Sequence, residues 1–140
     1  MKKTHLFWNE GQHSVGNALI DSQHQAIIDG VNQITEAVAN VNHSEAVQRI
    51  LEMIVLAREH FAVEEGLMTE NGFPDLKDHA KEHLRLLQQL NSLISEYQRV
   101  PSQYRVHLIH AFLTDWAEHH ILHQAEKELG EFLSAKGTSH

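Results

Sequence analysis

The stretch H-F-A-V-E-E-G-L-M-T-E-N-G-F-P-D-L-K-D-H-A-K-E-H, residues 60–83, decides the fold of this chain. It contains two pairs of residues four positions apart, His60 with Glu64 and His79 with His83, separated by the turn sequence N-G-F-P. Residues four apart on an α-helix lie on the same face. Two antiparallel helices joined at this turn would direct both pairs toward one point. Imidazoles and carboxylates that converge inside a helical bundle are typical of a two-metal site suited to iron or manganese.

The segments on either side of this stretch predict further helices. Apolar residues recur at three- and four-residue spacing, and no segment alternates for long enough to be a β-strand. We expect helices at about residues 19–41, 44–70, 75–99 and 102–135. Ser44 is the expected N-cap of the second helix, and Pro74 is expected in the first turn of the third. The pattern predicts a single all-α domain over residues 1–140, an up-down-up-down four-helix bundle with an ordered N-terminal arm at residues 1–18.

The composition fits a globular protein and excludes several classes of function. Hydrophobic residues make up 41% of the chain and charged residues 21%. A net charge of -8 without a Lys/Arg cluster argues against a nucleic-acid-binding surface. The absence of cysteine excludes disulfides, thiolate metal sites, iron–sulfur clusters and cysteine nucleophiles. We find neither a signal peptide nor an apolar run that could span a membrane, so the expected location is the cytoplasm.

The chain has 13 histidines, and they are dispersed through the predicted helices. His24 lies on the apolar side of the first predicted helix, and His120 lies on the inner stripe of the last. Glu64 lies on the apolar face of its helix, where a carboxylate must be paired, protonated or bound to a metal. The competing interpretation is a helical bundle with incidental histidines or a plain metal-storage module. Six inward ligand candidates on four helices favour a metal centre.

Several motifs at matching spacing resemble the hemerythrin family, specifically the single-domain bacteriohemerythrins, over essentially the whole chain. The segment around His60 and Glu64 is similar to that family's H-F-x-x-E-E motif, and His79 with His83 is similar to its H-x-x-x-H motif. The matching segments are Trp8 with Val15-Gly16, Ile20-Asp21-Ser22-Gln23-His24, His60-Phe61-Ala62-Val63-Glu64-Glu65, Phe73-Pro74 and Trp116 with His120-Ile121.

The resemblance implies reversible dioxygen binding at a non-haem di-iron centre, with the protein acting as a carrier, store or sensor rather than as an enzyme. It assigns one iron to His79, His83 and His120, the other to His24 and His60, and a bridging role to Glu64. The alternative is a di-iron redox enzyme, a peroxidase, an oxidase or a nitric-oxide-handling protein. Dioxygen is the expected partner, with neither nucleic acid nor membrane, and a separate signalling or redox partner is possible.

The chain departs from the family at one ligand. The family has a second bridging carboxylate, an aspartate, five residues after the last ligating histidine, where this chain has Ala125. The following tail, E-K-E-L-G-E-F-L, resembles the family's tail shifted by one residue, which makes Glu126 the replacement if a π-bulge absorbs the insertion. A regular helix would instead bring His123 or Gln124 nearer to His120, and a water-filled position is the third possibility. These alternatives remain open from the sequence.

The remaining residues of interest are expected to support the centre rather than bind metal. By resemblance, Asp21 and Glu65 are supporting residues. Histidines 107, 110, 119 and 123 are expected to be exposed or to lie behind the ligands. The candidates for an apolar shell that limits water entry are Ile20, Ile28, Phe61, Leu113, Trp116 and Ile121.

Overall fold

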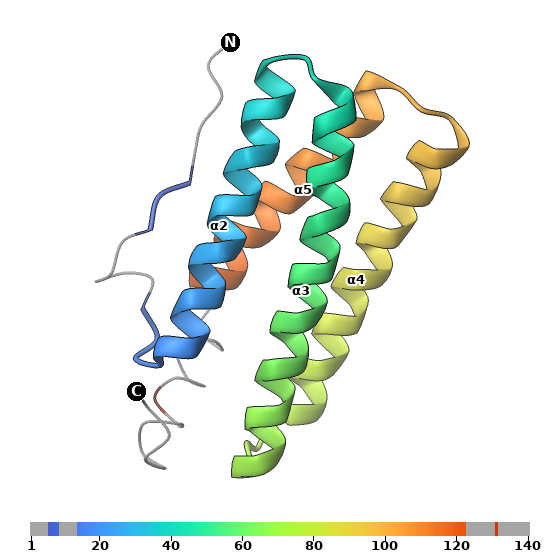
Figure 1. Cartoon of the computed structure of the whole chain (residues 1–140). Coiled ribbons are helices and arrows are strands. Elements are labelled where there is room, and N and C mark those ends of the chain that lie inside the picture. Colours follow the sequence, from blue (N-terminus) through green and yellow to red (C-terminus); the bar gives the residue numbers. More distant parts are fainter. Residues whose placement is uncertain (1–5, 9–13, 123–130, 132–140) are drawn as a thin grey trace.

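The computed structural model describes residues 6–8, 14–122 and 131, and within them four helices form an antiparallel bundle (Figure 1). Each helix packs against the two beside it, and α3 also contacts α5 across the bundle. The predicted all-α, up-down-up-down architecture is confirmed. The helices are α2 (Ala18–Ala39), α3 (His43–Asn71), α4 (Leu76–Arg99) and α5 (Gln103–Leu122).

The turn between α3 and α4 is fixed by Gly72, whose φ of 67° lies in the left-handed region. The Phe73 N–H donates to the Met68 carbonyl at 2.9 Å, and the Gly72 N–H donates to the Thr69 carbonyl at 3.4 Å. These two bonds form a Schellman motif, and Phe73 packs in one apolar cluster with Met68, as the motif favours. The chain therefore reverses directly after α3, which sets α4 antiparallel to it.

The second and third helices begin within one residue of the expected positions, but the placement of Ser44 as N-cap and of Pro74 in the first helical turn is wrong. Pro74 lies in the turn before α4, which begins at Leu76 after Asp75, because the chain first closes a turn in which the Leu76 N–H donates to the Phe73 carbonyl at 3.3 Å. Ser44 lies inside α3, because Asn42 is the N-cap and its side-chain oxygen accepts from the Glu45 N–H at 3.1 Å. Asparagine caps a helix as well as serine does, and Asn42 precedes Ser44 in the chain.

The short link between α2 and α3 also has Schellman geometry, but a valine occupies the left-handed position. Val41 has a φ of 54°, its N–H donates to the Val38 carbonyl at 3.0 Å, and the Asn42 N–H donates to the Ala37 carbonyl at 2.8 Å. A β-branched side chain is strained in this region. Val41 is 63% exposed, so the strain is not offset by burial of its side chain.

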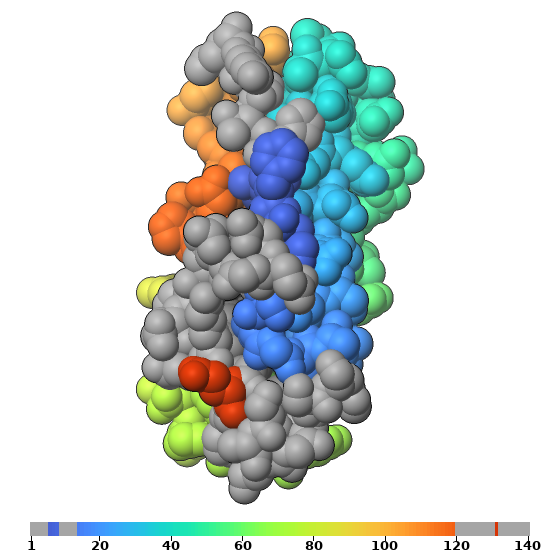
Figure 2. Space-filling view, turned by 90° about the vertical axis from the view of Figure 1, so that its left-hand side faces the viewer, coloured from blue at the N-terminus to red at the C-terminus, as the bar shows by residue number. Residues whose placement is uncertain are grey.

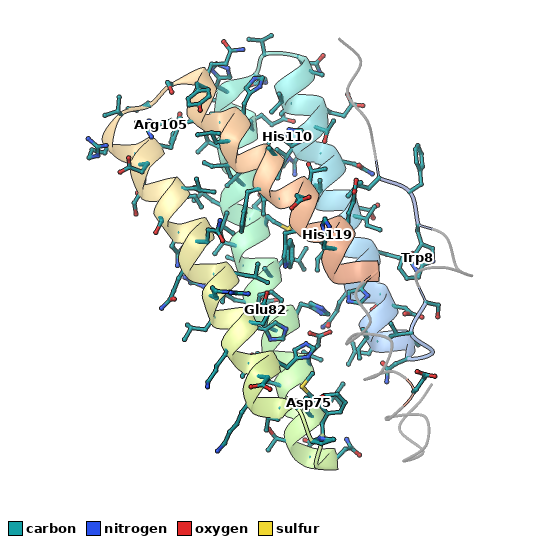
Figure 3. All side chains as sticks on the ribbon, turned by 180° about the vertical axis from the view of Figure 1, so that it is seen from behind. Trp8, Asp75, Glu82, Arg105, His110 and His119 are labelled. Carbon is teal, nitrogen blue, oxygen red and sulfur yellow. The ribbon has the colours of Figure 1, made fainter. Side chains whose placement is uncertain are left out.

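The described part of the arm is tied to α2 by side chains (Figure 2). The Asn32 amide accepts from the Leu6 N–H and donates to the Leu6 carbonyl, both at 2.8 Å. The buried Asp21 carboxylate accepts from the Val15 N–H at 2.9 Å and from the Ser14 hydroxyl at 2.6 Å. Trp8 lies beside the bundle in Figure 3 and is half-buried, in accord with a packing role. Asp21 therefore supports the entry of the chain into α2.

The main core runs along the bundle axis, built from aliphatic residues of all four helices with Phe61 and Trp116. A second apolar cluster, Val15, Ile20, Met68 and Phe73, closes the end beside the α3–α4 turn. Among the described residues, no helix is long and apolar enough to cross a membrane.

Candidate metal centre

Five of the seven predicted ligand residues converge in one half of the bundle. His24 comes from the start of α2, His60 and Glu64 from the end of α3, and His79 and His83 from the start of α4. These segments lie together in the lower part of Figure 1, next to the α3–α4 turn. The four-residue spacing places each pair on one helix face, and the turn at Gly72 brings the two faces together.

The carboxylate of Glu64 divides the four histidines into two pairs. Its Oε2 lies 3.2 Å from His60 Nε2 and 3.9 Å from His24 Nε2. Its Oε1 lies 3.2 Å from His83 Nε2 and 3.8 Å from His79 Nε2. Each carboxylate oxygen therefore faces the Nε2 atoms of two imidazoles. We call these the α2–α3 half, with His24 and His60, and the α4 half, with His79 and His83.

Glu64 is fully buried, and His24, His60 and His83 are at most 2% exposed. An ionised carboxylate in such a site requires a compensating positive charge, from a protonated imidazole or from a metal ion. Two groups of three residues could each hold a cation, His24 with His60 and Glu64, and Glu64 with His79 and His83; the ligand atoms within each group lie within 4.8 Å of one another. Nitrogen and carboxylate donors in this ratio suit iron, manganese or zinc.

Two further hydrogen bonds fix which ring nitrogen faces the centre. His60 Nδ1 lies 2.7 Å from Gln23 Oε1, and His83 Nδ1 lies 2.8 Å from Glu65 Oε2. Both oxygens accept, so Nδ1 carries a proton, and Nε2 is the ring nitrogen that faces Glu64. In a neutral ring this Nε2 atom has the lone pair that binds a metal ion, and a cation between it and the carboxylate 3.2 Å away would be attracted by both. The residues present therefore fit metal ions.

An aromatic wall separates the α4 half from the middle of the bundle. Phe61 stacks on His83 with ring centroids 3.9 Å apart and planes 9° apart, and Trp116 meets Phe61 edge-on at 5.8 Å. Ile20, Ile28 and Leu113 are buried as well, as the sequence predicts for an apolar shell. The side chain of Ile121 lies outside the described residues. A dry wall of this kind strengthens the electrostatic interactions inside the centre.

The other two predicted ligands, His120 and Glu126, have side chains outside the described residues. The backbone of His120 belongs to α5, and His123, Gln124 and Ala125 lie outside the described residues as well.

Glu65, which is predicted to support the centre, contacts His83, whereas the contact of Gln23 with His60 was missed. The sequence signal for Gln23 was its position directly before His24. The Gln23 side chain faces α3 rather than solvent. Of the additional histidines, His119 is exposed on α5 (Figure 3). His110 is half-buried, with its Nε2 atom 2.8 Å from the Thr35 hydroxyl. That hydroxyl donates to the Val31 carbonyl at 3.1 Å, so His110 Nε2 is the donor to it.

Comparisons with known proteins agree with this geometry. The family model described as "Hemerythrin HHE cation binding domain" matches residues 15–132. A bacteriohemerythrin of Methylococcus capsulatus is 27% identical over 130 residues, which cover 93% of this chain and 98% of the relative. A bacteriohemerythrin of Pseudomonas aeruginosa is 30% identical over 94 residues, which cover 67% of this chain but 58% of that protein. A crystal structure of a hemerythrin mutant superposes with a TM-score of 0.81 and 27% identity, covering 92% of this chain and 97% of the other.

Proposed function

Because the chain belongs to the hemerythrin family, we propose that it binds dioxygen reversibly at a di-iron centre in the bundle and serves as a carrier, store or sensor. The observation that carries this proposal is the position of Glu64. A single carboxylate whose two oxygens face two separate histidine pairs is arranged to bridge two metal ions. These residues would hold two ferrous ions, which would supply the electrons for reversible dioxygen binding.

The residues of the chain have separate tasks in this proposal. The four imidazoles would hold the ions through the Nε2 atoms that face Glu64, and the Glu64 carboxylate would be shared between the two ions. Gln23 and Glu65 hold the rings of His60 and His83 in the tautomer that binds metal. The wall of Phe61 and Trp116 excludes water from one side of the centre, which favours an apolar ligand such as dioxygen over water.

We propose that His120 completes the α4 half and that Glu126 is the second bridge. Both follow from the resemblance of the sequence, with the one-residue shift absorbed by a bulge in the helix. Alanine substitution of His123, Gln124 and Glu126, one at a time, distinguishes the candidates. Glu126→Ala is expected to lower the iron content or shift the visible spectrum, whereas His123→Ala and Gln124→Ala leave both unchanged. A spectral change confined to His123→Ala would assign that role to the histidine.

The experiment that tests the function is a visible absorption spectrum of the iron-loaded protein, reduced without oxygen and then exposed to air, together with an iron count. We expect a colourless reduced form, an absorption band that appears in air and disappears under vacuum, and two irons per chain. Rapid, irreversible oxidation without a lasting band would favour the redox-enzyme alternative. One iron or none would contradict the di-iron centre.

A further inference from the structure

The two histidines nearest Glu64 differ in the group behind them. His60 and His83 lie at the same distance from the carboxylate, each with Nε2 3.2 Å from one oxygen. Behind His60, the acceptor at 2.7 Å is the neutral amide oxygen of Gln23. Behind His83, the acceptor at 2.8 Å is the Glu65 carboxylate. The geometry is nearly symmetric, and the charge is not.

This difference changes how strongly each imidazole donates to a cation. A hydrogen bond from Nδ1–H to a carboxylate is charge-assisted and draws the proton away from the ring, which raises the electron density at Nε2. A hydrogen bond to an amide oxygen does so less. The Glu65 side chain is 36% exposed, so solvent screens part of its charge, but the His83 ring that it contacts is 3% exposed and transmits the effect of the hydrogen bond to the α4 half.

We propose that Glu65 and Gln23 are positioning residues that make the two halves of the centre unequal, so that the α4 half holds its divalent cation more tightly than the α2–α3 half does. This inference rests on the metal centre of the proposed function, but it does not depend on dioxygen. Its consequence is an order of loading, with the first metal ion bound beside His83 and the second beside His60.

The test uses the full-length metal-free protein, Zn²⁺ as the probe, and the NMR signals of the imidazole nitrogens of His60 and His83. In the unsubstituted protein the His83 signals should respond at lower Zn²⁺ than the His60 signals. Glu65→Gln makes both acceptors neutral amides, and it should weaken the α4 half by about 10–100-fold while leaving the α2–α3 half nearly unchanged. Gln23→Glu makes both acceptors carboxylates, and it should strengthen the α2–α3 half.

The resemblance assigns His120 to the α4 half as well, and a third histidine would by itself favour loading of that half. The order of loading in the unsubstituted protein therefore does not test the roles of Glu65 and Gln23, and the comparison of the two variants does. Equal weakening of both halves by Glu65→Gln, or no change in either variant, would overturn the proposal. Circular dichroism melts of the metal-free variants separate a local effect from unfolding, and Gln23→Glu gives an independent result if Glu65→Gln does not fold. Two equal Zn²⁺ sites would refute this inference alone, whereas failure to bind Zn²⁺ at all would also remove the metal centre.

Discussion

The two inter-helix turns allow one structural motif to be tested in opposite directions. Val41 and Gly72 occupy the same left-handed position in two Schellman motifs, with φ of 54° and 67°. An L-residue with a Cβ pays roughly 1–2 kcal/mol in this region, and a glycine does not. Glycine in turn costs about 0.4–1 kcal/mol through the greater freedom of the unfolded chain. Val41→Gly should therefore raise the free energy of unfolding by about 0.5–1 kcal/mol, although glycine substitutions usually destabilise proteins.

The matched change is Gly72→Ala. A Cβ built at Gly72 has no atom within 4 Å, so steric contact contributes nothing and only the backbone conformation is altered. The same estimate with the sign reversed gives a loss of about 0.5–1 kcal/mol. Val41→Ala serves as the control at the other turn. It retains a Cβ at positive φ, and should recover less stability than Val41→Gly does.

The assay is urea unfolding of metal-free protein followed by far-ultraviolet circular dichroism, with thermal melts in parallel. Metal is removed because a bound ion would stabilise all variants and mask small differences. For a chain of this size, 1 kcal/mol corresponds to a shift of about 3 °C in the melting temperature. If Val41→Gly lowers stability while Gly72→Ala leaves it unchanged, the assignment of strain to the Val41 backbone is wrong.

Three other changes have defined outcomes. A Cβ at Gly30 would lie 2.2 Å from the Met53 Cε atom, and Met53 is 1% exposed, so its tip would have to move inside the packed core. Gly30→Ala should therefore destabilise the contact of α2 with α3 and lower the urea midpoint, and an unchanged or higher midpoint would contradict this. Phe61→Ala removes a buried ring and should reduce the free energy of unfolding by about 3–5 kcal/mol, as urea titration would show. The Asp115 carbonyl and then its carboxylate raise the pKa of the exposed His119. Asp115→Asn should lower the pKa of His119 only partly in an NMR titration, because the carbonyl remains. The raised pKa also gives the folded protein a small stabilisation. This stabilisation is present below the ordinary histidine pKa and disappears as pH rises through the raised pKa.

The helices and the convergence of the ligands could be predicted because they depend on local spacing. His60 with Glu64 and His79 with His83 must share a helix face at four-residue spacing, and N-G-F-P between them is a clear turn signal. The start of α3 was less predictable, because Asn42 and Ser44 are both good caps and the choice depends on how α2 ends. The left-handed valine at position 41 carries no sequence signal, since composition favours glycine or asparagine there.

Within the centre, residue types were predictable but partners were not. The inward position of Glu64 followed from its apolar neighbours. That its two oxygens face different histidine pairs depends on the separation and rotation of three helices, which periodicity does not specify. The acceptor behind His60 is equally non-local, because Gln23 lies on α2 and His60 on α3. Side-chain contacts between different helices can be identified only from the packed structure.

The distribution of the ligands over α2, α3 and α4 also bears on how long a metal ion stays bound. The α3–α4 hairpin alone provides four of the five described ligand residues, whereas His24 arrives only when α2 has docked. With Glu64 fully buried in the folded chain, a chelator has no direct approach to its carboxylate. We expect release to require local opening of the bundle, and opening of α2 is the movement that removes His24 from the hairpin. The rate of metal exchange should therefore match the rate of local opening that amide hydrogen exchange reports for α2. The residence time of the ion would then measure how often this one helix opens.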